Sequence, residues 1–133
     1  MKTVSENPFS GKTYFYIIAP DTALDGLSDL EELNLADNLL VALPPDVFRP
    51  TRRLQRLDLH NNTLTALSPG LFSGLDRLIV LNVSRNDIGS KWVTGDTFSP
   101  LSNLVALDLS HNQLTVLDGQ ALSALRSLQV RIL

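Results

Sequence analysis

The stretch LIVLNVSRNDI (residues 78–88) decides the fold, because LVALDLSHNQL (residues 104–114) repeats its pattern. In both stretches, aliphatic residues occupy the first, fourth, sixth and last places, and an asparagine occupies the ninth. The same pattern, LxxLxLxxNxL, occurs at residues 54–64 and 30–40. The first leucines are residues 30, 54, 78, 104 and 128, so the spacings are 24, 24, 26 and 24. A nearly constant period of this length is typical of a solenoid.

Each repeat is expected to form one short strand around its L-x-L centre, for example residues 56–59. Alternation along a strand turns the leucines inward and the residues between them outward. Successive turns then place these strands about 4.8 Å apart in a parallel sheet. The remainder of each repeat returns on the opposite side, where a second apolar layer is expected from Phe48, Phe72, Phe98 and Leu122.

The third repeat is longer than its neighbours. Ile88 and Phe98 are ten residues apart (98 − 88), whereas the equivalent Leu64 and Phe72 are eight apart (72 − 64). The segment between Ile88 and Phe98 is therefore expected to bulge, with Trp92 or Val93 at the place of the missing leucine.

The four copies of LxxLxLxxNxL resemble the leucine-rich repeat family. The third copy, N-x-S-x-N-x-I followed by Trp92-Val93 and Thr97-Phe98, looks like the longer repeat of invertebrate Toll-type (Toll-like) receptor ectodomains. This resemblance implies a fragment of an extracellular recognition scaffold. The chain departs from that family in having no cysteine-rich caps, transmembrane helix or signalling domain.

The expected fold is an α/β, right-handed leucine-rich-repeat solenoid of about five turns. A short parallel β-sheet lines its concave face, and loops and short helical turns form its convex face. The expected organisation is a non-repeat tail at 1–14, followed by the solenoid at 15–133. The chain enters the solenoid inside a repeat whose own strand is missing. The solenoid divides into a partial repeat at 15–29, repeats at 30–53, 54–77, 78–103 and 104–127, and a partial repeat at 128–133.

One asparagine per repeat is predicted to be structural. The backbone turns inward after each strand and leaves amide and carbonyl groups without a strand partner. A carboxamide both donates and accepts, so it is expected to satisfy its own turn and the next one. This predicted asparagine ladder consists of Asn38, Asn62, Asn86 and Asn112.

Composition excludes several functions. The net charge of −3 and the absence of a basic run argue against nucleic acid or an anionic membrane as a partner. The apolar run at residues 14–19 is too short to span a bilayer. Without cysteine, the chain has no disulfide, thiolate nucleophile or cysteine–zinc site.

Catalytic and metal chemistry are not expected. His60 and His111 lie two repeats apart, roughly 10 Å by sheet spacing, which is too far to share a metal. Asp108, Ser110 and His111 occupy adjacent or alternating positions of one strand, so they do not converge as a hydrolase triad. We therefore expect no enzyme activity and no cofactor.

Two sequons for N-linked glycosylation are present, at Asn61-Asn62-Thr63 and Asn82-Val83-Ser84. Asn82 is expected to project from the open face of the sheet, where a glycan would compete with a partner. Chance occurrence of such sequons is the alternative.

Outward strand residues are expected to form columns on the concave face. They are charged in the first two repeats and aliphatic in the next two, an aliphatic centre with a charged rim that is typical of protein interfaces. The alternative is a solvated face with a few tolerated aliphatic residues. The candidate protein-binding residues are Arg56, Asp58, Ile79, Val80, Arg85, Val105, Ala106, Asp108 and His111.

The sequence thus indicates a non-catalytic protein-recognition scaffold. By resemblance, it belongs to the extracellular ligand-binding region of a Toll-type innate immune or developmental receptor, with a cystine-knot cytokine or another receptor copy as partner. The alternatives are an intracellular leucine-rich-repeat adaptor in the cytoplasm and a repeat fragment that self-associates through uncapped ends without a ligand. Cysteine-rich flanks and a membrane helix in the parent reading frame would favour the receptor.

Overall fold

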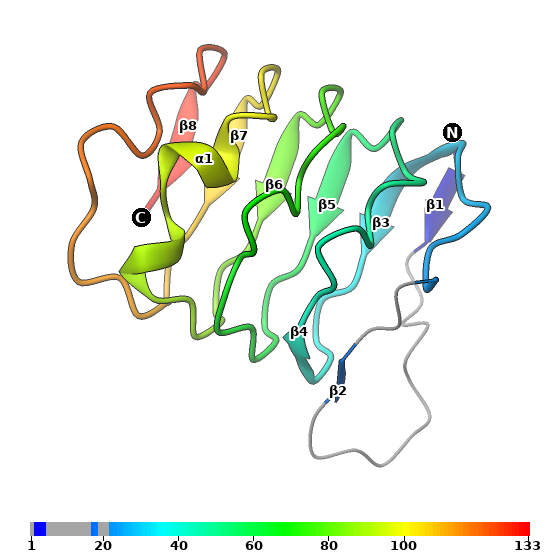
Figure 1. The fold of residues 1–133 in the computed structure, drawn as a ribbon, viewed down its shortest axis with the longest axis horizontal. Helices are drawn as coiled ribbons and strands as arrows, with labels where there is room; N and C mark the ends of the chain where they lie inside the picture. The colour runs from blue at the N-terminus through cyan, green and yellow to red at the C-terminus, as the bar shows by residue number, and fades with distance from the viewer. Residues whose placement is uncertain (1, 5–16, 19–21) are drawn as a thin grey trace.

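The computed structural model describes residues 2–4, 17–18 and 22–133 (Figure 1). One parallel sheet runs through it in the order β1-β3-β5-β6-β7-β8. Its strands are β1 (Lys2–Val4), β3 (Leu30–Asn34), β5 (Arg56–Asp58), β6 (Val80–Asn82), β7 (Ala106–Asp108) and β8 (Val130–Ile132). A second sheet pairs β2 (Ile17–Ile18) with β4 (Leu40–Ala42) in parallel. Two short helices, η1 (Ser90–Trp92) and α1 (Gly95–Phe98), belong to the third repeat.

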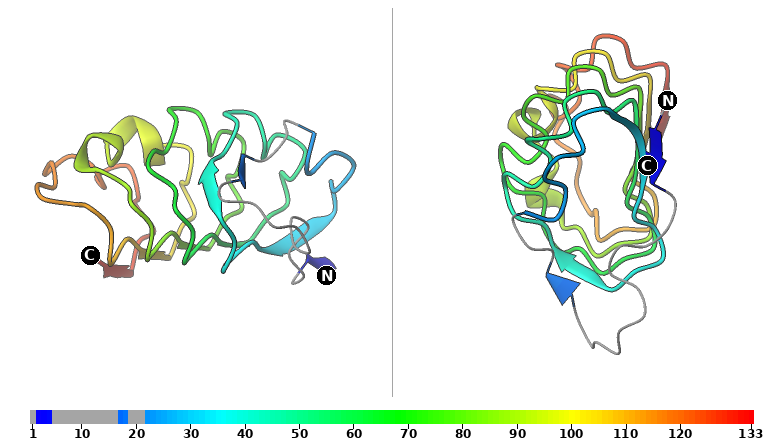
Figure 2. Two further views of the ribbon diagram at one scale, coloured as in Figure 1. Left: turned by 90° about the horizontal axis from the view of Figure 1, so that it is seen from below. Right: turned by 90° about the vertical axis from the view of Figure 1, so that its right-hand side faces the viewer.

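The sheet register follows the repeat period. Leu33 pairs with Leu57, Leu57 with Leu81, and Leu81 with Leu107. Viewed along the solenoid axis, the strands of the main sheet lie on one side of the coil and the helical turns on the other (Figure 2). The predicted parallel solenoid with strands on one face is therefore confirmed. Between Leu30 and Leu128 the chain makes four complete turns, fewer than the five expected, because the partial repeats supply no complete turn.

The interior contains two apolar layers. The leucines of the strands and of the following turns form one layer, and from Leu30 to Leu109 all of them except Leu39 are almost fully buried. Phe48, Phe72 and Phe98 form the second layer and stack in a row, with ring centroids 6.3 and 6.2 Å apart. Offset stacking at this separation is favourable for aromatic rings. Each turn thus buries the apolar side chains of its neighbour, as a solenoid requires.

The longer third repeat accommodates its two extra residues as helix. Val93 is buried at the place of the missing leucine, while Trp92 packs on the core and stays half-exposed. Thr94 caps α1 by accepting a hydrogen bond from the backbone N–H of Thr97, and the Thr97 hydroxyl donates to the Trp92 carbonyl at 2.7 Å. Because Thr94 caps α1 and the Thr97 hydroxyl binds the last carbonyl of η1, the two helical turns are joined by hydrogen bonds on the convex side.

The N-terminal side differs from the sequence-based picture. Residues 2–4, inside the expected tail, form β1 and pair with β3, with Val4 opposite Leu33. The sheet position before β3 is therefore occupied by a strand that carries no repeat pattern. The remaining residues of the expected tail, and Phe15 of the expected partial repeat, lie outside the described residues.

Candidate functional site

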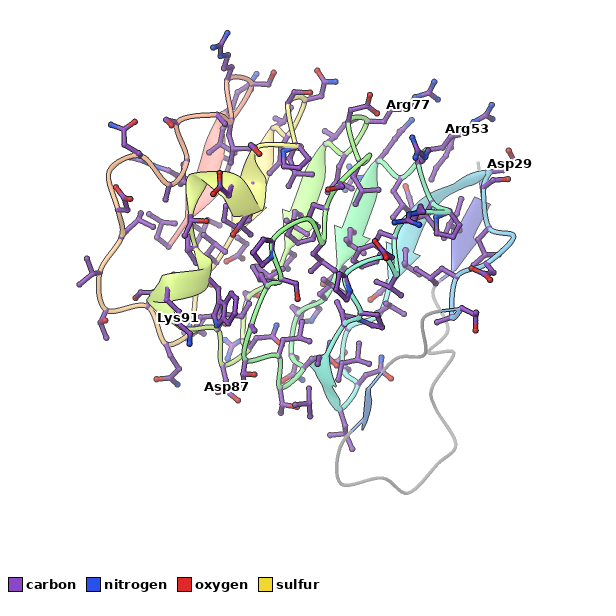
Figure 3. All side chains as sticks on the ribbon, in the orientation of Figure 1. Asp29, Arg53, Arg77, Asp87 and Lys91 are labelled. Carbon is purple, nitrogen blue, oxygen red and sulfur yellow. The ribbon has the colours of Figure 1, made fainter. Side chains whose placement is uncertain are left out.

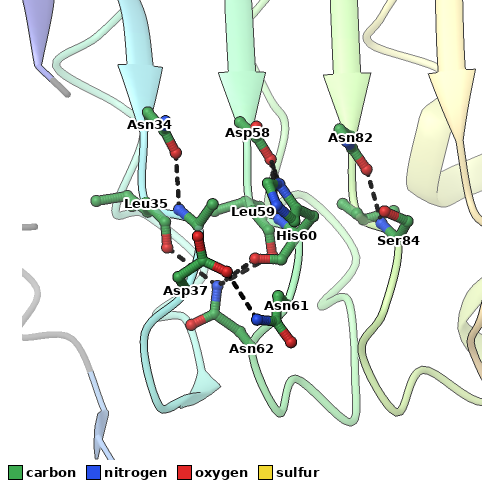
Figure 4. A network of polar contacts seen from close by, with 12 residues as sticks. Asn34, Leu35, Asp37, Asp58, Leu59, His60, Asn61, Asn62, Asn82 and Ser84 are labelled. Carbon is green, nitrogen blue, oxygen red and sulfur yellow. Dashed lines mark hydrogen bonds and ion pairs between the residues drawn. The ribbon is translucent and has the colours of Figure 1, made fainter.

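The ladder asparagines connect adjacent turns at the ends of the strands, as Figure 4 shows for Asn62. The Asn62 side-chain amide donates to the carbonyls of Leu59, in its own turn, and Leu35, in the preceding turn, both at 3.0 Å. Its Oδ1 accepts from the Leu40 N–H at 3.2 Å. The cross-turn bonds therefore run to the preceding turn, and the expectation that they run to the next one is wrong. The Asn62 side chain lies just after β5 and is directed toward the preceding turn.

Asn86 and Asn112 repeat this arrangement. Their side-chain amides donate to Leu59 and Val83 in the preceding turns, and their Oδ1 atoms accept from the N–H groups of Leu64 and Ile88. Asn38 differs, because its buried Oδ1 has no hydrogen-bond partner among the residues that the structure describes. These side chains fix the turns and leave the open face of the sheet to other residues.

The concave face consists of outward side chains in two main columns. The first column pairs Glu32, Arg56, Val80, Ala106 and Val130 across successive strands. The second pairs Asn34, Asp58, Asn82, Asp108 and Ile132. The predicted columns therefore exist, and both continue into β8.

The side chains of the second column accept hydrogen bonds from the backbone that follows their strands. The Oδ1 atoms of Asn34, Asp58, Asn82 and Asp108 each accept a hydrogen bond, at 2.9–3.0 Å, from the backbone N–H two residues later. Three of these bonds are visible in Figure 4. Asx turns of this kind fix the chain locally. Asp58 and Asp108 therefore have a structural role that sequence reasoning missed, although an Asn or Asp in all four repeats would have indicated it.

Two of these carboxylates also bind a neighbouring side chain. Asp58 Oδ1 lies 2.6 Å from His60 Nδ1, and Asp108 Oδ1 accepts from the Ser110 hydroxyl at 2.6 Å. The Ser110 hydroxyl is thus directed to the carboxylate. Among the described residues, no group of three His, Cys, Asp or Glu side chains is placed to hold a metal ion.

The aliphatic part of the concave face lies on β6, β7 and β8. Ile79 is 39% exposed, while Val80, Val105 and Ala106 are half-buried. The same surface continues to Val130 and Ile132, each 50% exposed, which the sequence-based candidate set omitted. They continue the columns of Ala106 and Asp108 in register, so the 24-residue spacing would have identified them. We call these six residues the aliphatic patch.

The charged part of the face lies beside this patch. Arg56 is largely exposed, and its Nε lies 3.8 Å from Glu32 Oε1 on the adjacent strand. A shallow depression of about 380 Å³ is lined by residues of β3, β5 and β6, among them Arg56, Asp58 and Val80. A shallow surface of this kind is suited to a protein rather than to an enclosed small molecule.

Two other candidate residues lie at the corner after the strands. Arg85 and His111 are exposed and have left-handed backbone conformations, with φ of 54° and 55°. Asp37 and Asn61 occupy the same place in earlier repeats with φ of 60° and 56°. The corner is thus next to the aliphatic patch but outside the sheet.

Other charged side chains lie at the two ends of the strands (Figure 3). Asp29, Arg53 and Arg77 are at the end where strands begin, and Arg53 Nη1 approaches Asp29 Oδ1 to 3.3 Å. Asp87 and Lys91 are at the opposite end, where Lys91 Nζ lies 5.0 Å from the Trp92 ring centroid. These groups lie at the ends of the strands, whereas the carboxylate beside the aliphatic patch is that of Asp108, which pairs with Ile132 in the second column.

The periodic register, the asparagine bonds and the phenylalanine row define a class of protein. The leucine-rich repeat model matches residues 19–62, 28–88 and 92–130, and the chain belongs to this family. Members of this family are typically non-catalytic binding scaffolds. Among curated proteins, no match is found. No helix in the described residues is long and apolar enough to cross a membrane.

Several solved structures of leucine-rich repeat proteins are similar to this chain. Drosophila Toll, in the Toll–Spätzle complex, is 33% identical with a TM-score of 0.78; the match covers 85% of this chain and 15% of that one. The leucine-rich repeat domain of APL1B is 30% identical with a TM-score of 0.78, over 88% of this chain and 34% of that one. An internalin (InlF) from Listeria monocytogenes, at 23% identity and a TM-score of 0.68 over 83% of this chain and 30% of that one, shares the fold. The chain therefore resembles Toll-type ectodomains and spans at most about a third of these relatives.

Proposed function

We propose that the chain is part of the extracellular ligand-binding region of a Toll-type receptor and that it binds a protein through its concave face. The aliphatic patch carries the proposal. Val80, Ala106 and Val130 lie in register on three adjacent strands and point away from the core. The fold does not need aliphatic side chains there, since Glu32 and Arg56 occupy the same column in earlier repeats.

The aliphatic patch combines the apolar centre and the polar rim that are typical of protein interfaces. Burying a half-exposed aliphatic side chain contributes on the order of 1 kcal/mol, about half of the value for full burial. Six such side chains with an Arg56–Glu32 pair at their margin form an apolar centre with a polar rim. A charged rim orients the partner and discriminates against others.

The proposed partner is a cystine-knot cytokine or another copy of the receptor. The solved structure of Drosophila Toll in complex with Spätzle supports a protein ligand. The corresponding location is outside the cell, as part of a longer receptor that acts in innate immunity or development. Drosophila Toll is 33% identical to this chain, so its ligand Spätzle is the first protein to test as a partner.

The test is capture of Spätzle by the purified chain, measured by biolayer interferometry. Val80→Glu places a carboxylate in the centre of the patch and should abolish capture while leaving the urea midpoint nearly unchanged. Thr65→Glu adds the same charge at an exposed position outside the main sheet and should bind normally. Equal binding by the two variants and the unmodified chain would refute the proposed site.

Self-association through end faces is the second candidate. Strand β8 is the last strand of the sheet order, and Val130, Ile132 and Leu133 are about half exposed. Within the described residues β8 pairs with β7 alone, and a strand edge without a partner pairs readily with another chain. Light scattering should then show a mass that rises with protein concentration, whereas a constant monomer mass would reject this candidate.

A further inference from the structure

The fold presents the two sequons differently. Asn61 and Thr63 are both exposed on the turn that follows β5. Asn82, by contrast, is half-buried in β6, and the hydroxyl-bearing Ser84 is only 6% exposed. Both residues of the first sequon therefore lie at the surface, where the Thr63 hydroxyl donates to the Leu40 carbonyl at 3.1 Å, whereas the hydroxyl-bearing residue of the second sequon is buried. We propose that Asn61 carries an N-linked glycan and that Asn82 does not, an inference that rests on the proposed extracellular function.

The Asn61 turn is fixed by its neighbours on both sides. The Asn61 backbone N–H donates to the Ser84 carbonyl at 3.0 Å, and the Thr63 N–H donates to the Leu40 carbonyl at 2.9 Å. The φ of 56° at Asn61 lies in the left-handed region, which asparagine tolerates better than most residues. The turn is thus ordered, while the side chain of Asn61 stays on the outside of the corner.

The Asn61 carboxamide has room for a substituent. Its Nδ2 donates one hydrogen bond to Asp37 Oδ1 at 2.7 Å (Figure 4). An amide nitrogen carries two hydrogens. Replacing the second hydrogen by a sugar leaves the bond to Asp37 intact, and neither residue belongs to the aliphatic patch.

The surroundings of Asn82 are less favourable. Its Oδ1 accepts from the Ser84 N–H at 2.9 Å, and its neighbours in the sheet are Asp58 and Asp108. A glycan on Asn82 would stand between these strands and cover Val80, two residues earlier in β6. Glycosylation at Asn61 alone leaves the concave face open.

The modification is a group transfer from a lipid-linked oligosaccharide pyrophosphate. A bond forms between Asn61 Nδ2 and the anomeric carbon of the first sugar, and the bond from that carbon to the pyrophosphate oxygen breaks. The bonding electrons leave with the lipid pyrophosphate, and the displaced Nδ2 proton passes to a base of the transferase.

The test is secretion of the full chain behind a cleavable signal peptide in a eukaryotic host. Site-resolved mass spectrometry after enzymatic glycan release should find one glycan, on Asn61. Thr63→Ala should abolish it and Thr63→Ser should retain it, while Asn82→Gln should change nothing. Both Thr63 variants keep Asn61; Thr63→Ala also removes the 3.1 Å hydrogen bond from the Thr63 hydroxyl to the Leu40 carbonyl, which Thr63→Ser retains. A glycan on Asn82, or a secreted chain without one on Asn61, would overturn the inference.

Failure of this inference is separable from failure of the proposed function. The signal peptide directs the chain to the transferase whether or not it binds a cytokine. Binding by Val80→Glu tests the concave face without reference to glycan occupancy. A glycan on Asn61 without cytokine binding would support the modification site and refute the binding site.

Discussion

Replacing Asn86 by alanine should destabilise the solenoid more than replacing Asn82, because only Asn86 is buried and multiply hydrogen-bonded. Asn86 Nδ2 donates to the carbonyls of Leu59, Val83 and Ser84 at 3.0–3.1 Å, and its Oδ1 accepts from the Leu64 N–H at 3.0 Å. The side chain is only 5% exposed, so water cannot replace these partners. A buried polar group left unpaired costs about 1–3 kcal/mol. With the Leu64 N–H and the Leu59 carbonyl both affected, we expect a loss of about 3–5 kcal/mol.

Asn82→Ala is the comparison. Asn82 is half-buried and accepts one hydrogen bond, from the Ser84 N–H at 2.9 Å, so its loss should cost about 1 kcal/mol. With a urea m-value of about 1–2 kcal/mol/M, the midpoint of the Asn86 variant should fall by at least about 1.5 M and that of the Asn82 variant by at most about 1 M. Asn103→Ala removes one exposed hydrogen bond, to the Asp76 carbonyl at 2.6 Å, and serves as the control for a surface carboxamide.

The measurement is urea unfolding followed by circular dichroism for all three variants. Equal midpoints for the Asn86 and Asn82 variants would refute the register, because they would mean that the two carboxamides have similar surroundings. A control variant that unfolds as early as the Asn86 variant would show that burial does not decide the cost.

Three further predictions follow from the convex side. Phe72→Ala removes the central ring of the phenylalanine row and should cost about 3–5 kcal/mol in urea unfolding; a loss below about 1 kcal/mol would contradict its full burial. Ser90→Ala removes the acceptor of the Thr115 N–H at 2.8 Å, so hydrogen exchange at Thr115 should accelerate, and an unchanged rate would rule out this contact. Thr51→Val should change the free energy of unfolding by less than about 1 kcal/mol. The buried Thr51 hydroxyl donates to the Phe48 carbonyl, which keeps the Thr51 N–H as a donor after the substitution. A larger loss would show that the hydroxyl is essential.

The architecture was predictable because the repeat period fixes which residues are neighbours. A 24-residue spacing makes Leu57 the partner of Leu33 and Val80 the partner of Arg56, and the sheet register agrees at each place. The phenylalanine row follows from the same spacing, and the bulge in the third repeat was placed by counting residues. Only the choice between Trp92 and Val93 needed the structure, which buries Val93.

Other features were not predictable, since no repeat pattern encodes them. Strand β1 has no leucine pattern, and it joins the sheet by backbone hydrogen bonding, which any sequence other than proline provides. The direction of the asparagine bonds depends on which side of the turn the carboxamide faces, which spacing does not fix. The sequence makes Asp58 a binding candidate because it is charged and outward, yet its carboxylate accepts a hydrogen bond from the backbone N–H of His60.

Covalent footprinting of exposed aliphatic side chains, with and without Spätzle, tests the recognition face most directly. Ile79, Val130 and Ile132 belong to the aliphatic patch, whereas Leu39 and Val116 are exposed at 44% and 71% outside it. We predict that Spätzle lowers labelling of the first three and leaves the other two unchanged. Protection of Leu39 or Val116 with full labelling of the aliphatic patch would contradict recognition through the concave face.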